Sequence, residues 1–207
     1  MSPIITHEDE LELAKMEKDL VSHLKKEAKL QRAVASSQMK LAEDIARLTI
    51  GRQLLNRTFR DVLKQMQTLA RESKSNIKDE EVNIFQDIIH DNDEYIETSN
   101  SYINSLKDLS VNKEMIANRE ELFANALSEL AGRRSGLIKK ALSIEKTKNK
   151  MIEGSKLTML ENELNDLQRD FDRTRNTLLK EIEQFLQTKD ELNEVWIELK
   201  DTVKKMS

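Results

Sequence analysis

The sequence predicts an all-α protein, built as an elongated antiparallel three-helix coiled coil. Three observations support this fold class. The 207-residue chain has only four Gly and one Pro, apolar residues recur at spacings of three and four over long runs, and 35% of the residues are charged against 38% hydrophobic. Sheets and compact mixed folds need turn residues every few positions, so the scarcity of Gly and Pro excludes them. Coiled-coil helices bury only one stripe each, so a modest apolar content suffices.

Two polar breaks divide the periodic pattern into three helices, preceded by a short leader over residues 1–7. We expect the first helix over about 8–75, the second over about 80–152 and the third over about 156–205, all in one domain, 8–207. Asp79 followed by Glu80 and Glu81 suits a helix N-terminus, where acidic side chains complement the helix dipole. Helices of roughly 75–105 Å cannot surround a spherical core, so they must fold back on one another.

The apolar stripes of the first two helices are wider than a single coiled-coil seam, which predicts self-association. A homodimer is the default expectation, and a higher oligomer is a further possibility. The residues expected in the core or the dimer interface are Leu48, Leu55, Phe59, Phe85, Ile89, Ile96, Leu164, Phe171, Ile182, Phe185 and Trp196.

The net charge of −4 is unevenly distributed along the chain. Segment charges are −4 over residues 1–24, +7 over 25–75, −8 over 76–125, +5 over 126–160 and −4 over 161–207. If the first two helices are antiparallel about a break near residue 78, residue x lies level with residue 157−x. This register would bring the basic stretch 25–32 beside Arg133 and Arg134. We expect these two arginines, Lys139 and Lys140 to be exposed.

Clustered basic residues can simply form a solvated helix face with no partner. They can also form a binding surface for an anionic partner. A phospholipid surface fits best, because the basic blocks carry no interleaved aromatic residues and no nucleic-acid recognition motif. The expected membrane-binding residues are Lys25, Lys26, Lys29, Arg32, Arg133, Arg134, Lys139, Lys140, Lys146, Lys148, Lys150 and Lys156.

No catalytic or metal-binding constellation is recognisable in the sequence. The three His residues are scattered, and the Asp87/His90 spacing lacks the second copy that a di-iron bundle requires. The segment Gly132–Gly136 is not a P-loop, and there is no Cys for thiolate chemistry. We therefore expect neither an enzyme nor a cofactor. The acidic N-terminus and the lack of a long apolar run predict a soluble intracellular chain.

Three local patterns, beyond the helical architecture, resemble a known family. They are the stretch 111–123 in the middle of the second helix, the Lys-rich stretch 139–150 before the second break, and the run 178–185 followed by Leu192-Asn-Glu-Val-Trp196. Together they resemble the BAR domain of a sorting nexin, over about residues 8–205.

This resemblance implies a crescent-shaped antiparallel homodimer whose concave face and tips bind curved anionic membrane. It implies a role in endosomal protein sorting and tubule formation, with a cytoplasmic protein held peripherally on endosomes. Sorting nexins also carry a preceding PX domain that binds phosphoinositide; none is visible here, so we expect the chain to be a fragment. The cargo and other sorting partners are not predicted, nor is a heterodimer excluded. The alternative is a coiled-coil scaffold that assembles proteins without touching membrane.

Overall fold

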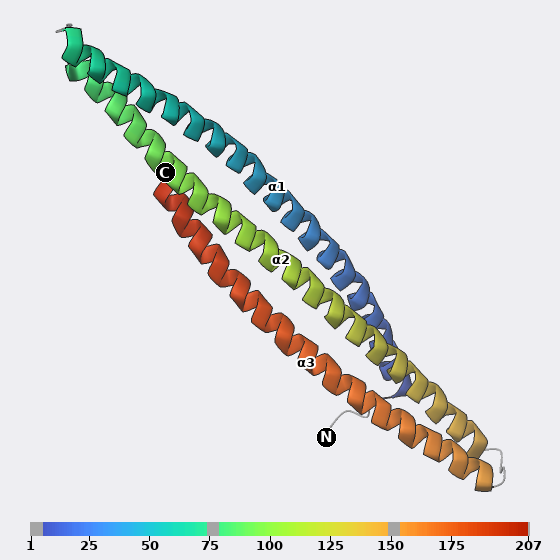
Figure 1. Ribbon diagram of the computed structural model, residues 1–207. Coiled ribbons are helices and arrows are strands. Elements are labelled where there is room, and N and C mark those ends of the chain that lie inside the picture. The colour runs from blue at the N-terminus through green and yellow to red at the C-terminus, as the bar shows by residue number, and fades with distance from the viewer. Residues whose placement is uncertain (1–5, 74–78, 149–153, 207) are drawn as a thin grey trace. The chain divides into compact units, whose positions relative to one another are not determined.

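The computed structural model describes residues 6–73, 79–148 and 154–206, and all of them except Thr6 are helical (Figure 1). The helices are α1 (His7–Ser73), α2 (Asp79–Lys148) and α3 (Gly154–Met206). The described ranges contain no strand, which confirms the all-α prediction. Each helix end lies within four residues of its expected position. The expected residues 149–152 of the second helix lie outside the described ranges.

The first helix begins with a reciprocal cap. The Thr6 backbone N–H and hydroxyl donate hydrogen bonds to Asp9 Oδ2 at 2.8 and 2.7 Å, and the Asp9 N–H donates to Thr6 Oγ1 at 3.2 Å. These bonds satisfy N–H groups that have no partner within the helix. The side-chain bond from Thr6 is the main cause that lowers the pKa of Asp9. The α1 helix therefore starts at a position fixed by its own sequence.

The chain divides into two compact units, each built from a segment of every helix. Unit 1 comprises Met1–Arg32 and Glu114–Asp190. Unit 2 comprises Ala33–Lys113 and Glu191–Ser207.

Unit 1 has a core to which all three helices contribute. Val21 and Leu24 of α1 pack with a buried row on α2 and with Leu178 of α3. On α2, Ala117, Ala124 and Ala131 are completely buried at intervals of seven residues. Because these side chains are small, neighbouring helices can approach α2 closely.

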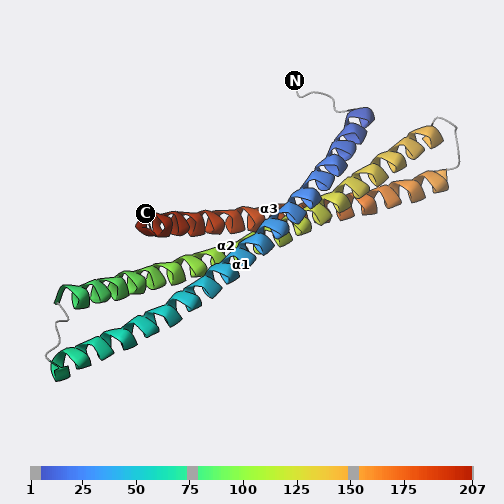
Figure 2. The ribbon, with the colours of Figure 1, turned by 90° about the horizontal axis from the view of Figure 1, so that it is seen from above.

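Unit 2 is an antiparallel α1–α2 hairpin with the last turns of α3 packed beside α2 (Figures 1 and 2). Ala42 of α1 and Ile103 and Leu106 of α2 form its buried cluster. The buried Ser110 hydroxyl donates a hydrogen bond of 2.7 Å to the Ala35 carbonyl, joining α2 to α1. Near the end of α3, Val203 lines the same groove as Tyr102 of α2. Because α3 ends only three residues later, at Met206, the first turns of α2 lie beyond the end of α3.

The part of the hairpin beyond α3 has a thin interior. Among residues 49–72 and 80–98, for which burial is described, only the polar residues Thr49 and Asn56 are buried. Phe59 and Phe85 meet edge to face with ring centroids 6.0 Å apart, yet both are only half-buried. Two helices alone leave much of each apolar side chain in contact with water.

Candidate functional site

The basic residues expected to bind membrane all lie in unit 1, and the structure separates them by exposure. Those that are exposed are Lys25, Lys26, Lys29, Lys139, Lys146, Lys148 and Lys156. Those that are half-buried are Arg32, Arg133, Arg134 and Lys140, so the expectation of exposure holds for Lys139 but is wrong for Arg133, Arg134 and Lys140. Lys150 lies outside the described residues.

Arg134 is a structural residue, which corrects the expectation that it is exposed. Its side chain is only 15% exposed, and its guanidinium binds Glu17 at 2.9 Å and Glu10 at 2.5 Å, both on α1. It also lies over the Phe171 ring of α3, 5.2 Å from the centroid. Burial alone would lower the pKa of Arg134, but the hydrogen bonds to Glu17 and Glu10 raise it above its ordinary value. The charge therefore persists and holds three helices together.

Four further basic residues of the expected set are held by carboxylates within the chain. Arg32 binds Glu121, and this hydrogen bond is the main cause that lowers the pKa of Glu121. The other three pairs connect α2 to α3: Arg133 with Asp170 at 2.9 Å, Lys140 with Glu163, and Lys148 with Glu161 at 3.1 Å. These pairs reduce the positive charge that a partner could use.

The expected convergence of the two basic blocks is wrong. Arg32 reaches Glu121, four residues short of the expected level, and Arg134 reaches Glu17 and Glu10 instead of the basic stretch 25–32. The end of α1 at Ser73 and the start of α2 at Asp79 are centred on residue 76, and a shift of the centre by about two residues moves the register by about four. The basic stretch of α1 therefore lies level with acidic residues of α2.

Six lysines of the expected set make no ion pair with any described residue, and we call them the lysine set. They are Lys25, Lys26, Lys29, Lys139, Lys146 and Lys156. The first three occupy little more than one turn of α1, and the next two lie seven residues apart on α2. All six residues are exposed, and Lys25 and Lys29 lie near enough to Glu121 for their charges to contribute to lowering its pKa.

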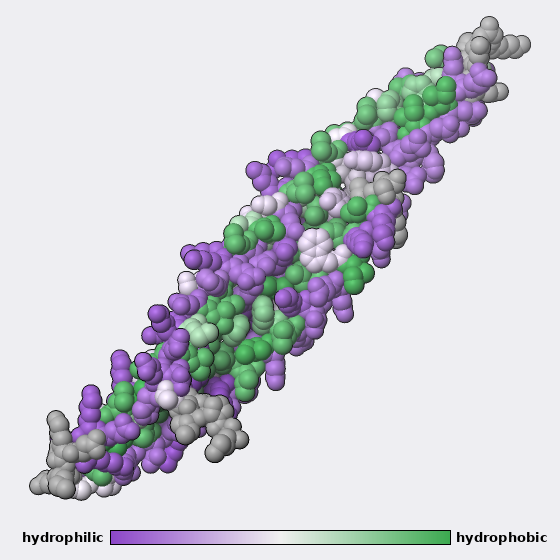
Figure 3. Space-filling model, turned by 180° about the vertical axis from the view of Figure 1, so that it is seen from behind, coloured by the Kyte–Doolittle hydropathy of each residue, from purple (hydrophilic) through white to green (hydrophobic). Residues whose placement is uncertain are grey.

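Unit 2 carries a different surface, an apolar stripe along α1. Its members recur at intervals of seven or fourteen residues, and we call it the α1 stripe: Val34, Leu41, Leu48, Leu55 and Leu69. All are exposed in the single chain, Leu48 by 70%. Strips of apolar side chains between charged ones are visible on the surface in Figure 3. A heptad-spaced row of this kind is typical of a coiled-coil seam that another helix covers.

The eleven residues expected in the core or the dimer interface fall into two groups. Three are exposed: Leu48, Leu55 and Trp196. Eight are half-buried: Phe59, Phe85, Ile89, Ile96, Leu164, Phe171, Ile182 and Phe185. Trp196, for which core packing is the sequence-based expectation, is 44% exposed in the single chain. A role in a dimer interface stays a prediction for all eleven.

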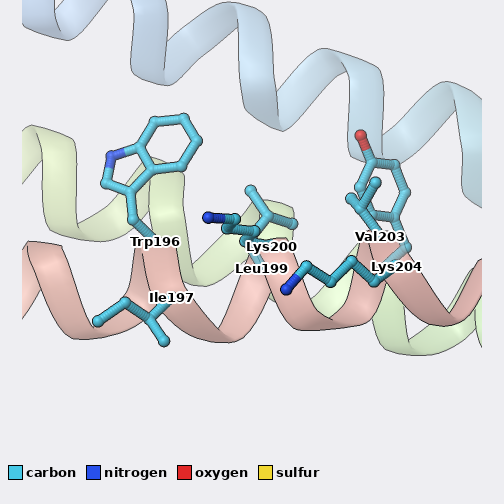
Figure 4. Close-up of a pocket in the computed structure, with 7 residues that line it drawn as sticks. Trp196, Ile197, Leu199, Lys200, Val203 and Lys204 are labelled. Atoms are coloured by element: carbon cyan, nitrogen blue, oxygen red, sulfur yellow. The ribbon is translucent and has the colours of Figure 1, made fainter.

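Trp196 stands at the edge of a groove of about 630 Å³ in unit 2, which we call the α3 groove (Figure 4). Its lining residues are Tyr102, Trp196, Ile197, Leu199, Lys200, Val203 and Lys204. Lys113 Nζ lies 5.8 Å from the centroid of the Trp196 ring, which places a third cation beside the apolar lining.

Sequence reasoning did not identify the Arg134 contacts, the α1 stripe as an exposed row, or the α3 groove. One signal for the first was present, since Glu10 and Glu17 are seven residues apart and so lie on one face of α1. Among the described residues, no cluster of three or more His, Cys, Asp or Glu is arranged to hold a metal ion. None of the described helical segments is both long and apolar enough to cross a bilayer.

Comparison with known proteins gave no match to any family model, curated protein or solved structure.

Proposed function

We propose that the protein is a dimerisation module that binds anionic phospholipid membrane, of the BAR type found in sorting nexins. In this proposal it acts peripherally on endosomal membranes, in protein sorting and tubule formation. The single observation that carries the membrane part is the lysine set, six exposed cations with no ion pair to a described residue.

The lysine set supports membrane binding by charge alone. A basic residue near an anionic leaflet contributes about 1 kcal/mol, and salt screens this attraction. In this proposal several of the six lysines from each chain face the same leaflet, and their summed attraction supports reversible binding. No insertion of apolar residues is needed, and the binding should therefore depend strongly on ionic strength.

The α1 stripe and the thin interior of unit 2 support the dimer. Helices gain most of their stability from packing an apolar face, and the hairpin beyond α3 packs only two helices together. A second copy that covers Leu48 and Leu55 would remove about 25 cal/mol of unfavourable apolar hydration for each Å² buried. In the proposed dimer the stripe of one copy packs against the same stripe of the other under a two-fold axis, as a symmetric interface requires.

A coiled-coil scaffold without membrane contact is the second candidate. It is favoured by the pairing of Arg32, Arg133, Arg134, Lys140 and Lys148 with carboxylates of the same chain. Under this alternative the α1 stripe would assemble proteins and the lysine set would only keep the surface solvated.

Co-sedimentation with vesicles separates the two candidates. The chain is mixed with phosphatidylserine-containing vesicles of several diameters, at low and moderate salt. We expect binding that weakens as salt rises, and tubulation of the vesicles at high coverage. The triple variant Lys139→Glu/Lys146→Glu/Lys156→Glu should lose most of the binding while keeping its helical circular dichroism spectrum.

The matched control carries the same change in charge elsewhere. Lys40, Lys64 and Lys189 are exposed and lie outside the lysine set, so their replacement by Glu should reduce binding far less. Equal losses in both triple variants would mean that net charge, and not the lysine set, governs binding. An absence of binding by the native chain at low salt would overturn the membrane function and leave the scaffold.

A further inference from the structure

The α3 groove combines an apolar lining with positive charge. Two of its seven lining residues are Lys200 and Lys204, and Lys204 Nζ lies 3.7 Å from Asp201 Oδ1 on the same helix, so Lys200 is the cation on which the argument rests. In Figure 4, Trp196 and Ile197 project from opposite sides of α3, and the Lys200 side chain lies near Leu199. Such a site suits a helix that presents aliphatic side chains flanked by carboxylates.

The same chain contains a helix of that chemistry. Over residues 79–106 there are eight Asp or Glu and no Lys or Arg. Ile84 and Ile88 lie one turn apart on α2 with exposures of 57% and 37%. Glu81, Asp87 and Asp91 are exposed nearby. This stretch belongs to the part of α2 that α3 does not reach.

The segment cannot fill the groove of its own chain. Ile88 is fourteen residues from Tyr102 along one continuous helix, a distance of roughly 21 Å. Tyr102 lines the groove, so the groove and Ile88 are well separated along the axis of α2. Contact between them requires a second molecule.

We propose that the α3 groove of each copy receives residues 80–91 of α2 from a second copy, with Ile84 and Ile88 against the apolar lining and the acidic residues beside Lys200. Two-fold symmetry makes this contact twice in each dimer. The inference rests on the dimer of the proposed function, and it specifies which surfaces meet.

Site-directed disulfide trapping tests the contact, since the native chain has no Cys. The Cα atoms of a disulfide lie within about 7 Å of each other, whereas Ile88 is far from the groove of its own chain. The double variant Ile88→Cys/Val203→Cys can therefore form this bond only between two chains. Under mild oxidation we expect a covalent dimer. The matched control Val111→Cys/Val203→Cys places the first cysteine at another exposed apolar position of α2, and its yield should be roughly tenfold lower.

Charge reversal provides a second measurement that does not depend on cysteine geometry. Lys200→Glu should weaken the dimer roughly tenfold, and Glu81→Lys/Asp87→Lys should do the same. Combining all three changes should restore most of the affinity, because the opposite charges meet again. Sedimentation equilibrium measures each dissociation constant, and circular dichroism confirms that each variant remains helical.

The outcomes separate this inference from the dimer itself. A native chain that is dimeric, but gives no specific trapping and no rescue by charge reversal, would overturn the groove contact and leave the dimer standing. A native chain that is monomeric at all accessible concentrations would overturn both.

Discussion

Unit 1 and unit 2 are built from the same three helices but bury their apolar side chains to different extents. Among the described residues, unit 1 contains 13 of the 20 buried apolar residues and 10 of the 24 exposed large ones. Unit 2 contains 7 of the buried apolar residues and 14 of the exposed large ones. A surface with this much exposed aliphatic area is typical of an interaction site. The difference supports the proposal that a second copy covers part of unit 2.

The distribution of ion pairs follows the same division. In unit 1, pairs made by Arg32, Arg133, Arg134, Lys140 and Lys148 join different helices. In unit 2, the pair of Arg60 with Asp93 joins α1 to α2. Unit 1 thus fixes its helices by both apolar packing and charge, and its remaining exposed lysines can serve another purpose.

The largest effect is expected from Arg134→Ala in unit 1. The change would leave Glu10 and Glu17 without a cation, and Glu17 is only 9% exposed. Removing one partner of a buried ion pair costs about 3–5 kcal/mol, which urea denaturation would measure. Arg169→Ala is the control, since the described partner of Arg169 is the exposed Asp166, and this change should alter the stability by less than about 0.5 kcal/mol. Equal losses would mean that the Arg134 contacts do not stabilise unit 1.

A smaller effect is expected from Asn56→Asp in unit 2. Asn56 Nδ2 donates to Asp93 Oδ1 at 2.8 Å, so the new carboxylate would face another carboxylate in a buried position. We expect a loss of about 2 kcal/mol at neutral pH, most of it recovered in Asn56→Asp/Asp93→Asn. A double variant as unstable as the single one would show that repulsion between the two groups is not the cause.

Leu55→Ala should produce a smaller loss that depends on protein concentration. Leu55 is 49% exposed in the single chain, so its truncation should cost about 1 kcal/mol only where the dimer is populated. Thermal melts over a hundredfold range of concentration would measure this. Leu127→Ala in the core of unit 1 is the contrast, because its loss should be present at every concentration.

The smallest effect is a dependence of unit 1 on pH. The pKa values of Asp9 and Glu121 are lowered in the folded chain, so the stabilisation they provide is present at neutral pH. It weakens as the pH falls below the ordinary pKa values of 4.5 for Glu and 3.8 for Asp, and it is lost once both groups are protonated in the folded chain as well. Melting temperatures between pH 3 and 7 should therefore fall less steeply for Asp9→Asn/Glu121→Gln than for the native chain. Parallel curves would contradict these assignments.

The sequence was sufficient to predict the three helices, because the polar breaks and the apolar spacing are local features. It could not identify which of two adjacent stripes of α1 faces inward. Leu48 and Leu55 are the more apolar residues, yet their neighbours Thr49 and Asn56 are the buried ones. The smaller side chains allow α1 and α2 to approach closely, a condition that depends on the facing helix and not on periodicity.

The candidate site was predictable only in part for a similar reason. Charge counts located the basic blocks, and Lys25, Lys26 and Lys29 are exposed. The pairing of Arg134 depends on the register between α1 and α2, which changes by two residues for each residue of shift in the centre of the turn. The α3 groove depends on where α3 ends beside α2, a relation between segments far apart in the sequence.

Sedimentation equilibrium of the native chain tests the central claim most directly, namely that unit 2 is completed by a second copy. The account predicts a mass near twice 24.0 kDa at micromolar concentration, and a mass near 24.0 kDa for the variant Leu48→Asp/Leu55→Asp with unchanged helical content. A native chain that sediments as a folded monomer of 24.0 kDa throughout would contradict it.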